Sequence, residues 1–144
     1  MDADDTRVVD VKATFRHSAG RLGSRYFASI RDEERILGWR TGDPARVLVP
    51  PKDLGLPGEW VEVGPGATLE AYAPEEWLRA ANSSISEDES SLALVRLDGA
   101  DTSMLAHLRP KATNADSYPV GLRLVAHFRA ERLGEASDLW FEPE

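Results

Sequence analysis

The chain has 144 residues, of which 42% are hydrophobic and 29% charged, and its formal net charge is −8. This length and composition predict one ordinary domain with room for a small additional subdomain. No apolar run reaches the roughly 18 residues of a membrane span, and the absence of cysteine excludes disulfides and any cysteine-held zinc or iron–sulfur site.

The negative charge is concentrated in the middle of the chain. Residues 61–101 carry two Lys or Arg against nine Asp or Glu, whereas residues 1–60 carry ten of each sign. Nucleic-acid binders show the opposite balance, because release of phosphate counterions requires Lys and Arg. The acidic start "MDADDTRVVD" also lacks the basic and apolar stretches of a signal peptide, so we expect a cytoplasmic protein.

After an N-terminal segment, residues 24–37 carry the pattern of an amphipathic helix. Ser24 suits the N-cap and Gly38 suits the C-terminal stop. Its apolar residues recur at helical spacing on one face: Tyr26, Phe27, Ile30 and Leu37.

From Gly38 onward the pattern becomes that of β-structure. "ARVLVPP" predicts a short strand ended by two prolines, and residues 60–73 predict two strands, or one bent strand, around a Gly-Pro-Gly break. Pro74 suits the first position of a helical turn, which a Ser- and acid-rich loop follows. Further strands are expected within residues 91–99, 102–110, 121–134 and 137–144.

Alternation of apolar residues predicts which side of these strands is buried: Leu92, Leu94 and Leu97, then Leu122, Leu124, Ala126 and Phe128. About five strands of this kind fit a small Greek-key barrel of OB type.

No residue pattern predicts a catalytic site. His107 and His127 read as ordinary strand residues, while His17 next to Ser18 favours a stabilised turn over a nucleophile–base pair. The stretch "GRLGSR" lacks the lysine ending of a phosphate loop, and the acidic run 87–89 lacks a calcium-loop frame.

Aromatic and basic residues are the candidates for binding. Trp77 fits either a cover over one end of the barrel or a partner contact, and the same choice applies to Tyr26 and Phe27. Four basic residues fit either local ion pairs or the phosphates of a nucleotide-like ligand: Arg25, Arg40, Arg46 and Lys52.

Several segments in order resemble an acyl-CoA-associated family of zinc-ribbon and OB-fold proteins, domain-of-unknown-function family 35. The motifs are "HSAGRLGSRYFASIRDEERILGWR", "RVLVPPKD", "EWVEVGPGATLEAYA", "LALVRLDG" and "GLRLVAHFRAERLG" with the closing "FEP". The resemblance covers roughly residues 14–143. It implies a mainly β fold with an N-terminal segment and helix (1–37), a rubredoxin-like ribbon (38–60), and an OB-fold barrel (61–144) with an exposed loop at about 74–91.

In that family two Cys-x-x-Cys knuckles hold zinc in the ribbon. Here the first knuckle falls on Thr41 and Pro44, and the second falls near Gly55 and Gly58, none of which ligates zinc. The resemblance therefore implies a degenerate ribbon without metal, in which prolines and the flanking Trp39 and Trp60 replace the missing restraint.

The resemblance also implies a non-catalytic accessory subunit. Its partner would be a thiolase-like enzyme, an acyl-CoA thiolase or a side-chain aldolase acting on steroid or aromatic CoA esters, in a hetero-oligomer with two copies of each chain. A hydratase is a further expected partner; the CoA ester is the substrate of the complex, and no cofactor is bound by this chain. The expected interface or CoA-adjacent residues are Arg25, Tyr26, Phe27, Trp39, Arg40, Arg46, Lys52 and Trp77. The alternative is a free-standing OB-fold protein that binds a ligand or single-stranded nucleic acid, for which stacking aromatics beside a basic groove are required.

Overall fold

The computed structural model describes residues 12–14, 18–74, 77–78, 80, 91–110 and 118–144. Its elements are α1 (Gly20–Glu33), β1 (Ile36–Thr41), β2 (Val47–Leu48), β3 (Gly58–Val63), β4 (Gly66–Ala73), β5 (Leu92–Leu97), β6 (Met104–Ala106), β7 (Arg123–Phe128), η1 (Ala136–Asp138) and β8 (Leu139–Pro143). One helix and two antiparallel sheets make the fold mainly β, as the sequence predicts.

Helix α1 packs one face inward and ends earlier than the sequence suggests. Its buried residues, at i, i+4, i+7 and i+8, are Leu22, Tyr26, Ser29 and Ile30. The predicted boundaries are wrong: Ser24 lies inside the helix, the N–H of Gly20 donates to the Oγ of Ser18, and Glu34 ends the helix with a left-handed φ of 51°. The helix cannot continue to Leu37, because Ile36 to Thr41 pair along their whole length with β3.

The smaller sheet, in the order β2-β1-β3, occupies the segment where the sequence predicts a ribbon. Trp39 and Trp60 are register partners across β1 and β3, and their rings meet edge to face at 5.0 Å. Gly38 is a strand residue rather than a helix stop. A Cβ there would lie 2.6 Å from the Cγ1 of Val47, so this close strand packing requires glycine.

The larger sheet, in the order β6-β5-β4-β7-β8, curls into a five-stranded barrel. Leu108, just beyond β6, forms a parallel bridge with Phe141 of β8, and the N–H groups of Arg109 and Phe141 donate to the carbonyls of Phe141 and His107. The bridge brings the two outer strands together at one end. The sheet thereby forms the partly open Greek-key barrel that the sequence predicts. The Gly-Pro-Gly break separates two strands that belong to different sheets.

The two sheets are joined by hydrogen bonds as well as by the chain between β3 and β4. The N–H of Val47 donates to the Oδ2 of Asp101 at 2.8 Å, and the N–H of Val49 donates to the Oγ1 of Thr102 at 2.8 Å. The same hydroxyl donates to the carbonyl of Val49 at 3.0 Å. The loop between β5 and β6 thus binds the outer edge of β2, which leaves less unpaired edge.

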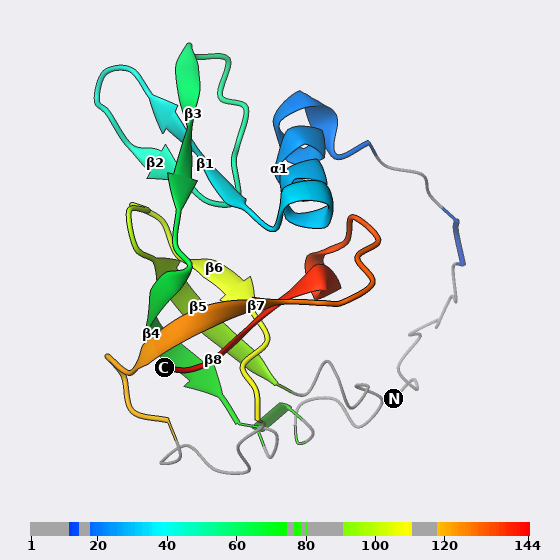
Figure 1. Cartoon of the computed structure of the whole chain (residues 1–144), viewed down its shortest axis with the longest axis vertical. Coiled ribbons are helices and arrows are strands. Elements are labelled where there is room, and N and C mark those ends of the chain that lie inside the picture. The colour runs from blue at the N-terminus through cyan, green and yellow to red at the C-terminus, as the bar shows by residue number, and fades with distance from the viewer. Residues whose placement is uncertain (1–11, 15–17, 75–76, 79, 81–90, 111–117) are drawn as a thin grey trace, which may run out of the picture.

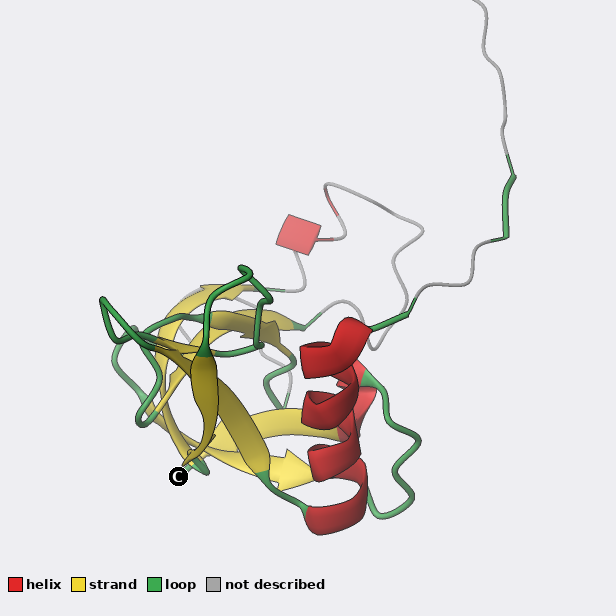
Figure 2. Ribbon diagram, turned by 90° about the horizontal axis from the view of Figure 1, so that it is seen from above, coloured by secondary structure: helices red, strands yellow, loops and turns green. Residues whose placement is uncertain are grey.

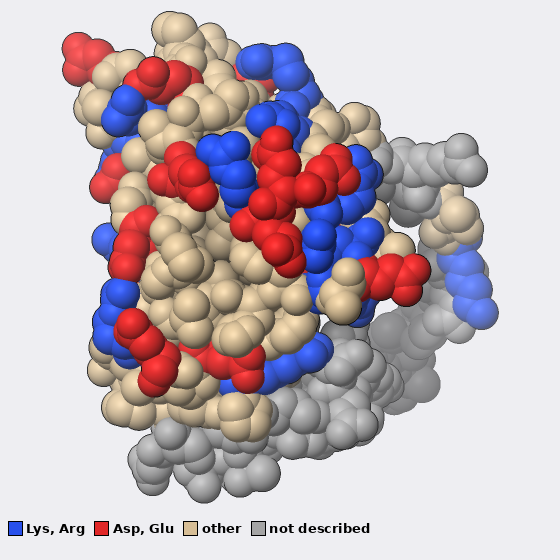
Figure 3. Space-filling view, in the orientation of Figure 1, with Lys and Arg blue, Asp and Glu red and all other residues tan. Residues whose placement is uncertain are grey.

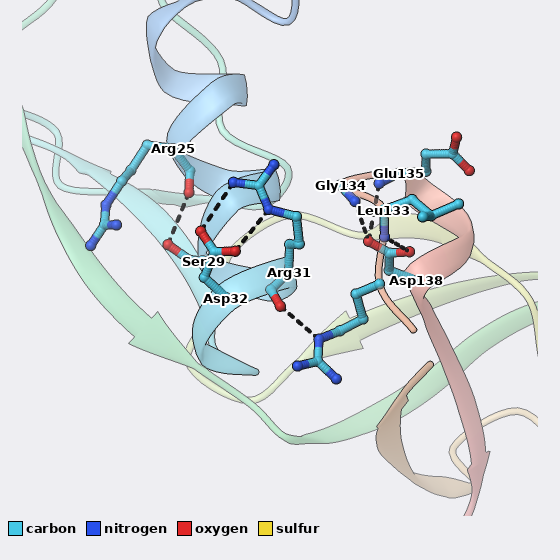
Figure 4. A network of polar contacts seen from close by, with 9 residues as sticks. Arg25, Ser29, Arg31, Asp32, Leu133, Gly134, Glu135 and Asp138 are labelled. Atoms are coloured by element: carbon cyan, nitrogen blue, oxygen red, sulfur yellow. Dashed lines mark hydrogen bonds and ion pairs between the residues drawn. The ribbon is translucent and has the colours of Figure 1, made fainter. Parts of the chain in front are cut away.

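Helix α1 lies beside the sheets in the view from above (Figure 2) and is tied to the segment before β8. The Nε of Arg132 donates to the carbonyl of Arg31 at 2.8 Å. Close by, the buried carboxylate of Asp138 accepts three backbone N–H bonds, from Leu133, Gly134 and Glu135 (Figure 4). These contacts fix the loop that faces the helix.

Helix, ribbon sheet and barrel share one continuous hydrophobic core. Tyr26 and Ile30 from the helix, Val49 and Val63 from the ribbon segment, and Phe141 from the barrel belong to the same buried cluster. The ribbon is therefore held by apolar burial against the barrel. The domain boundaries proposed from the sequence stay a prediction.

Candidate functional site

The outer surface of the barrel carries an exposed apolar area over three neighbouring strands. We call it the β4–β6 apolar face and define it by Ala71, Leu92, Leu94 and Leu105. Leu94 pairs in register with both Ala71 and Leu105, and the side chains of Leu94 and Leu105 are 36% and 67% exposed. A β-bulge between Leu69 and Ala71 lets two consecutive residues of β4 face outward at this point.

This face overturns one prediction. The sequence alternation suggested that Leu92 and Leu94 face the core, but the structure buries Ala93, Val95 and Leu97 instead. Only Leu97 of the predicted set points inward. The prediction for the later strand is confirmed: Leu124 and Ala126 are buried, with Leu122 and Phe128 packed against the core.

Charged groups beside this face pair within the chain. The Nε of Arg96 lies 2.8 Å from the Oε1 of Glu70, and the Oε2 of the same carboxylate accepts a hydrogen bond from the hydroxyl of Ser103. Arg123 forms a two-point pair with Asp98 at 2.9 and 2.6 Å, and this hydrogen bonding lowers the pKa of the Asp98 carboxyl. The charged side chains of the outer surface thus pair with one another. Among the described residues, no helix or strand packs over the β4–β6 apolar face.

A cavity of about 170 Å³ adjoins the β4–β6 apolar face. We call it the helix–barrel cavity, because Tyr26, Phe27 and Ile30 of α1 form one side and residues of β5, β6 and η1 form the other. Leu92 and Leu105 belong both to this lining and to that of a shallower hollow over the face. The two apolar areas are therefore continuous.

Few polar groups line the helix–barrel cavity. Burial raises the pKa of Tyr26 to about 12, so its hydroxyl stays protonated at neutral pH. The Nδ1 of His107 lies 2.7 Å from the carbonyl oxygen of Ser91, so Nδ1 carries the hydrogen and the Nε2 of a neutral ring is an acceptor. The lining thus includes the hydroxyl residues Tyr26 and Ser137 and the imidazole of His107 among mostly apolar side chains.

The structure separates the residues that the sequence analysis grouped as interface candidates. Tyr26 and Trp39 are buried, Phe27 is half-buried beside Tyr26, and Trp77 is 57% exposed. The basic candidates are exposed and lie on different elements: Arg25 on α1, Arg40 on β1, Arg46 before β2 and Lys52 in the loop before β3.

Two of the basic candidates form local ion pairs. Arg40 pairs with Glu59 across β1 and β3, and Arg25 lies 3.9 Å from Glu33 on the same helix. Side chains of both signs alternate over α1 and the loop before η1 on the face shown in Figure 3. That face presents no continuous basic surface in the described part of the chain. The binding roles of these residues stay predictions.

Hydrogen bonds and close packing occupy the positions on which the sequence resemblance places the two zinc-free knuckles. The buried hydroxyl of Thr41 donates to the carbonyl of Pro44 at 2.8 Å and accepts the N–H of Arg46 at 3.0 Å. At the second position a Cβ on Gly58 would lie 2.7 Å from the ring of Trp39. Among the described residues, no group of three or more His, Asp or Glu side chains is arranged to hold a metal ion.

His127, one of the remaining chemical candidates, has partners within the fold. The Nε2 of His127 lies 2.9 Å from Glu142, and its ring stacks on Trp140. His17 lies outside the described residues, as does the acidic run 87–89. The described part of Pro74 to Ala80 agrees with the expected helical turn, because the N–H groups of Trp77 and Leu78 donate to the carbonyl of Pro74.

Local sequence patterns give no signal for Leu105 or for the cavity. Leu105 stands between Met104 and Ala106 in a continuous apolar run, so alternation gives no signal for the one side chain that points outward. The cavity joins α1 to Pro50 and to residues between Leu92 and Leu139, which are far from the helix in sequence, so local patterns do not reveal it.

Comparison with known proteins finds a likeness in structure. No protein-family model matches the chain, and neither does any curated protein sequence. A solved chain described as "Ltp2-ChsH2(DUF35) aldolase" is similar in structure, with a TM-score of 0.62 and 17% sequence identity over 89% of this chain and 98% of that chain. The likeness shows that the two chains share a fold over nearly their whole lengths.

No helix in the described part of the chain is long and apolar enough to cross a membrane.

Proposed function

We propose that this chain is a non-catalytic accessory subunit of a heteromeric enzyme complex with a thiolase-like partner. The observation that carries the proposal is the likeness to a chain whose description joins Ltp2 and ChsH2 in one aldolase, over 98% of that chain. The ordered motifs in the sequence support membership of the same domain-of-unknown-function family 35.

The role that we propose is structural. The chain stabilises the partner and shapes its CoA and acyl channel, and the partner cleaves or condenses steroid or aromatic CoA esters in a cytoplasmic complex with two copies of each subunit. Arg46 and Lys52 are exposed and are our candidates for contact with CoA phosphates. The zinc-free ribbon is a degenerate form of the family's metal-bearing one.

The β4–β6 apolar face is the surface that we propose for partner contact. Leu94 and Leu105 lie side by side on a rigid sheet, and burial of such residues at an interface is favourable by about 25 cal/mol per Å². The charges beside them already pair within the chain, so a partner that covers the leucines need not supply counter-charges.

The test is recovery of the tagged full chain from its native cell extract, with the co-purifying proteins identified by mass spectrometry. We expect a thiolase-fold protein in near-equal amount. Leu105→Arg should abolish its recovery, whereas Leu133→Arg should not, because Leu133 is an exposed leucine (57%) outside this face. Elution of the wild-type chain alone as a stable monomer would refute the accessory role. Equal recovery by both variants would refute the assigned surface.

A further inference from the structure

The helix–barrel cavity has the size of one aromatic ring. Its volume is about 170 Å³, and an apolar protein cavity of roughly 150 Å³ binds benzene. Phe27, Ile30, Met104 and Leu139 contribute apolar walls, since each belongs to the lining and is buried or half-buried. The lining therefore suits a flat group of six or seven carbon atoms.

The hydroxyl of Tyr26 distinguishes this cavity from a packing defect. Tyr26 is only 3% exposed, and its hydroxyl has no hydrogen-bond partner among the described residues. Every fully buried polar side-chain atom in the described part of the chain is paired, so this hydroxyl must reach accessible space. Tyr26 is one of the residues that line the helix–barrel cavity.

A buried hydroxyl that faces an apolar space favours one kind of occupant. A pure hydrocarbon in contact with it would leave the O–H without a partner, which disfavours binding. A ring that carries a hydroxyl or another hydrogen-bonding atom fills the same volume and pairs with Tyr26. His107 lies in the same lining and offers an acceptor nitrogen as a second polar contact.

We propose that the helix–barrel cavity is a binding site for one phenol-like ring, held by apolar contacts and by a hydrogen bond with the hydroxyl of Tyr26. The proposal concerns the isolated chain and does not depend on the accessory role proposed above. A free small molecule and a tyrosine side chain of another protein both present such a ring, and the chemistry of recognition is the same in both.

The test is titration of the isotope-labelled full chain with p-cresol and with toluene, followed by NMR of the methyl groups of Ile30, Met104 and Leu139. We expect saturable shifts at these methyl groups and tighter binding of p-cresol. Tyr26→Phe removes only the oxygen; it should weaken p-cresol binding by about 3- to 10-fold, the effect of one net hydrogen bond, and leave toluene binding unchanged or stronger.

A second variant closes the cavity without disturbing the core. Ala136 is exposed and belongs to the lining, so Ala136→Trp should abolish binding of both probes. Leu133→Trp, at an exposed position outside the lining, is the matched control and should bind like the wild type. Absence of saturable binding of p-cresol, or equal binding by Ala136→Trp and the wild type, would overturn the proposal. An unchanged ratio of p-cresol to toluene affinity in Tyr26→Phe would overturn the assigned hydrogen bond.

A third probe distinguishes the two sources of the ring. N-acetyl-tyrosinamide presents the same phenol with backbone on both sides. Binding comparable to that of p-cresol supports a side chain presented by another protein, whereas binding of p-cresol alone supports a free small molecule. Failure of both probes would refute the site while leaving the partner-recovery experiment, and thus the proposed function, unaffected.

Discussion

Thr41→Val tests whether hydrogen bonds close the ribbon turn at Thr41 and Pro44, the position of the first, zinc-free knuckle. The hydroxyl of Thr41 is buried, donates to the carbonyl of Pro44 at 2.8 Å and accepts the N–H of Arg46 at 3.0 Å. Valine has nearly the same shape and also suits a strand. The substitution therefore removes these two bonds and little packing.

The expected cost follows from the two bonds. A neutral hydrogen bond contributes about 0.5–1.5 kcal/mol to folding. Pro44 and Arg46 are exposed residues, so water replaces part of what their backbone groups lose. We expect the free energy of unfolding to fall by about 1–2 kcal/mol. With a urea m-value of about 1.5 kcal/mol per molar, the unfolding midpoint should fall by about 1 M.

Urea unfolding followed by tryptophan fluorescence measures this change, because the Trp39–Trp60 pair lies in the same sheet. Thr41→Ser is the matched control. It keeps the hydroxyl and loses one methyl group, so its cost should stay below about 0.8 kcal/mol. If Thr41→Ser is more destabilising than Thr41→Val, packing rather than hydrogen bonding holds this turn, and the reasoning fails.

Two further substitutions test other parts of the fold. Burial raises the pKa of Asp138, but its three backbone hydrogen bonds outweigh burial and hold the pKa below the ordinary 3.8. The ionised carboxylate therefore stabilises the folded protein above pH 3.8, and this contribution is lost as the pH falls through the lower folded-state pKa. Asp138→Asn should therefore destabilise the protein at pH 7, with a gap from the wild type that narrows below pH about 4; urea unfolding that shows the same gap at pH 7 and pH 3 would contradict this. Gly58→Ala should cost about 1–3 kcal/mol, because the new Cβ would lie 2.5 Å from the carbonyl oxygen of Arg40 and 2.7 Å from the ring of Trp39. Gly42→Ala should cost less, because the atom nearest to its Cβ would lie 4.0 Å away; equal thermal midpoints of the two variants would disprove the steric argument.

Helical periodicity located the buried face of α1 but not its ends. Tyr26 and Ile30 are buried and Phe27 is half-buried, at positions that follow from the helical repeat. The ends depended on contacts elsewhere. Residues 36–41 pair with β3, so Leu37 is a strand residue although its spacing fits the helix. Six paired residues outweigh the local helix propensity of the sequence.

Alternation located the strands of the barrel but chose the wrong face in β5. Leu92, Leu94 and Arg96 lie on one side of the strand, and Ala93, Val95 and Leu97 lie on the other. The prediction grouped Leu92 and Leu94 with Leu97, although strict alternation places Leu97 on the opposite side and Arg96 on the side of Leu92 and Leu94. Ala93, Val95 and Leu97 face the barrel interior, whereas Leu92 and Leu94 lie on the outer surface, where they belong to the candidate interface.

The amino-acid sequence by itself determined the elements and several exclusions: a mainly β chain with one amphipathic helix, a break at the Gly-Pro-Gly stretch, and no cysteine ligand for a metal. These properties depend on residue type and on spacing over a few positions, which the sequence states directly. The tertiary structure alone decided which leucines face outward, that the β5–β6 loop binds the edge of β2, and that Tyr26 meets a cavity shared with η1. Each of these arises from contacts between residues far apart in the chain, whose geometry is set only when the helix and the two sheets pack around one core.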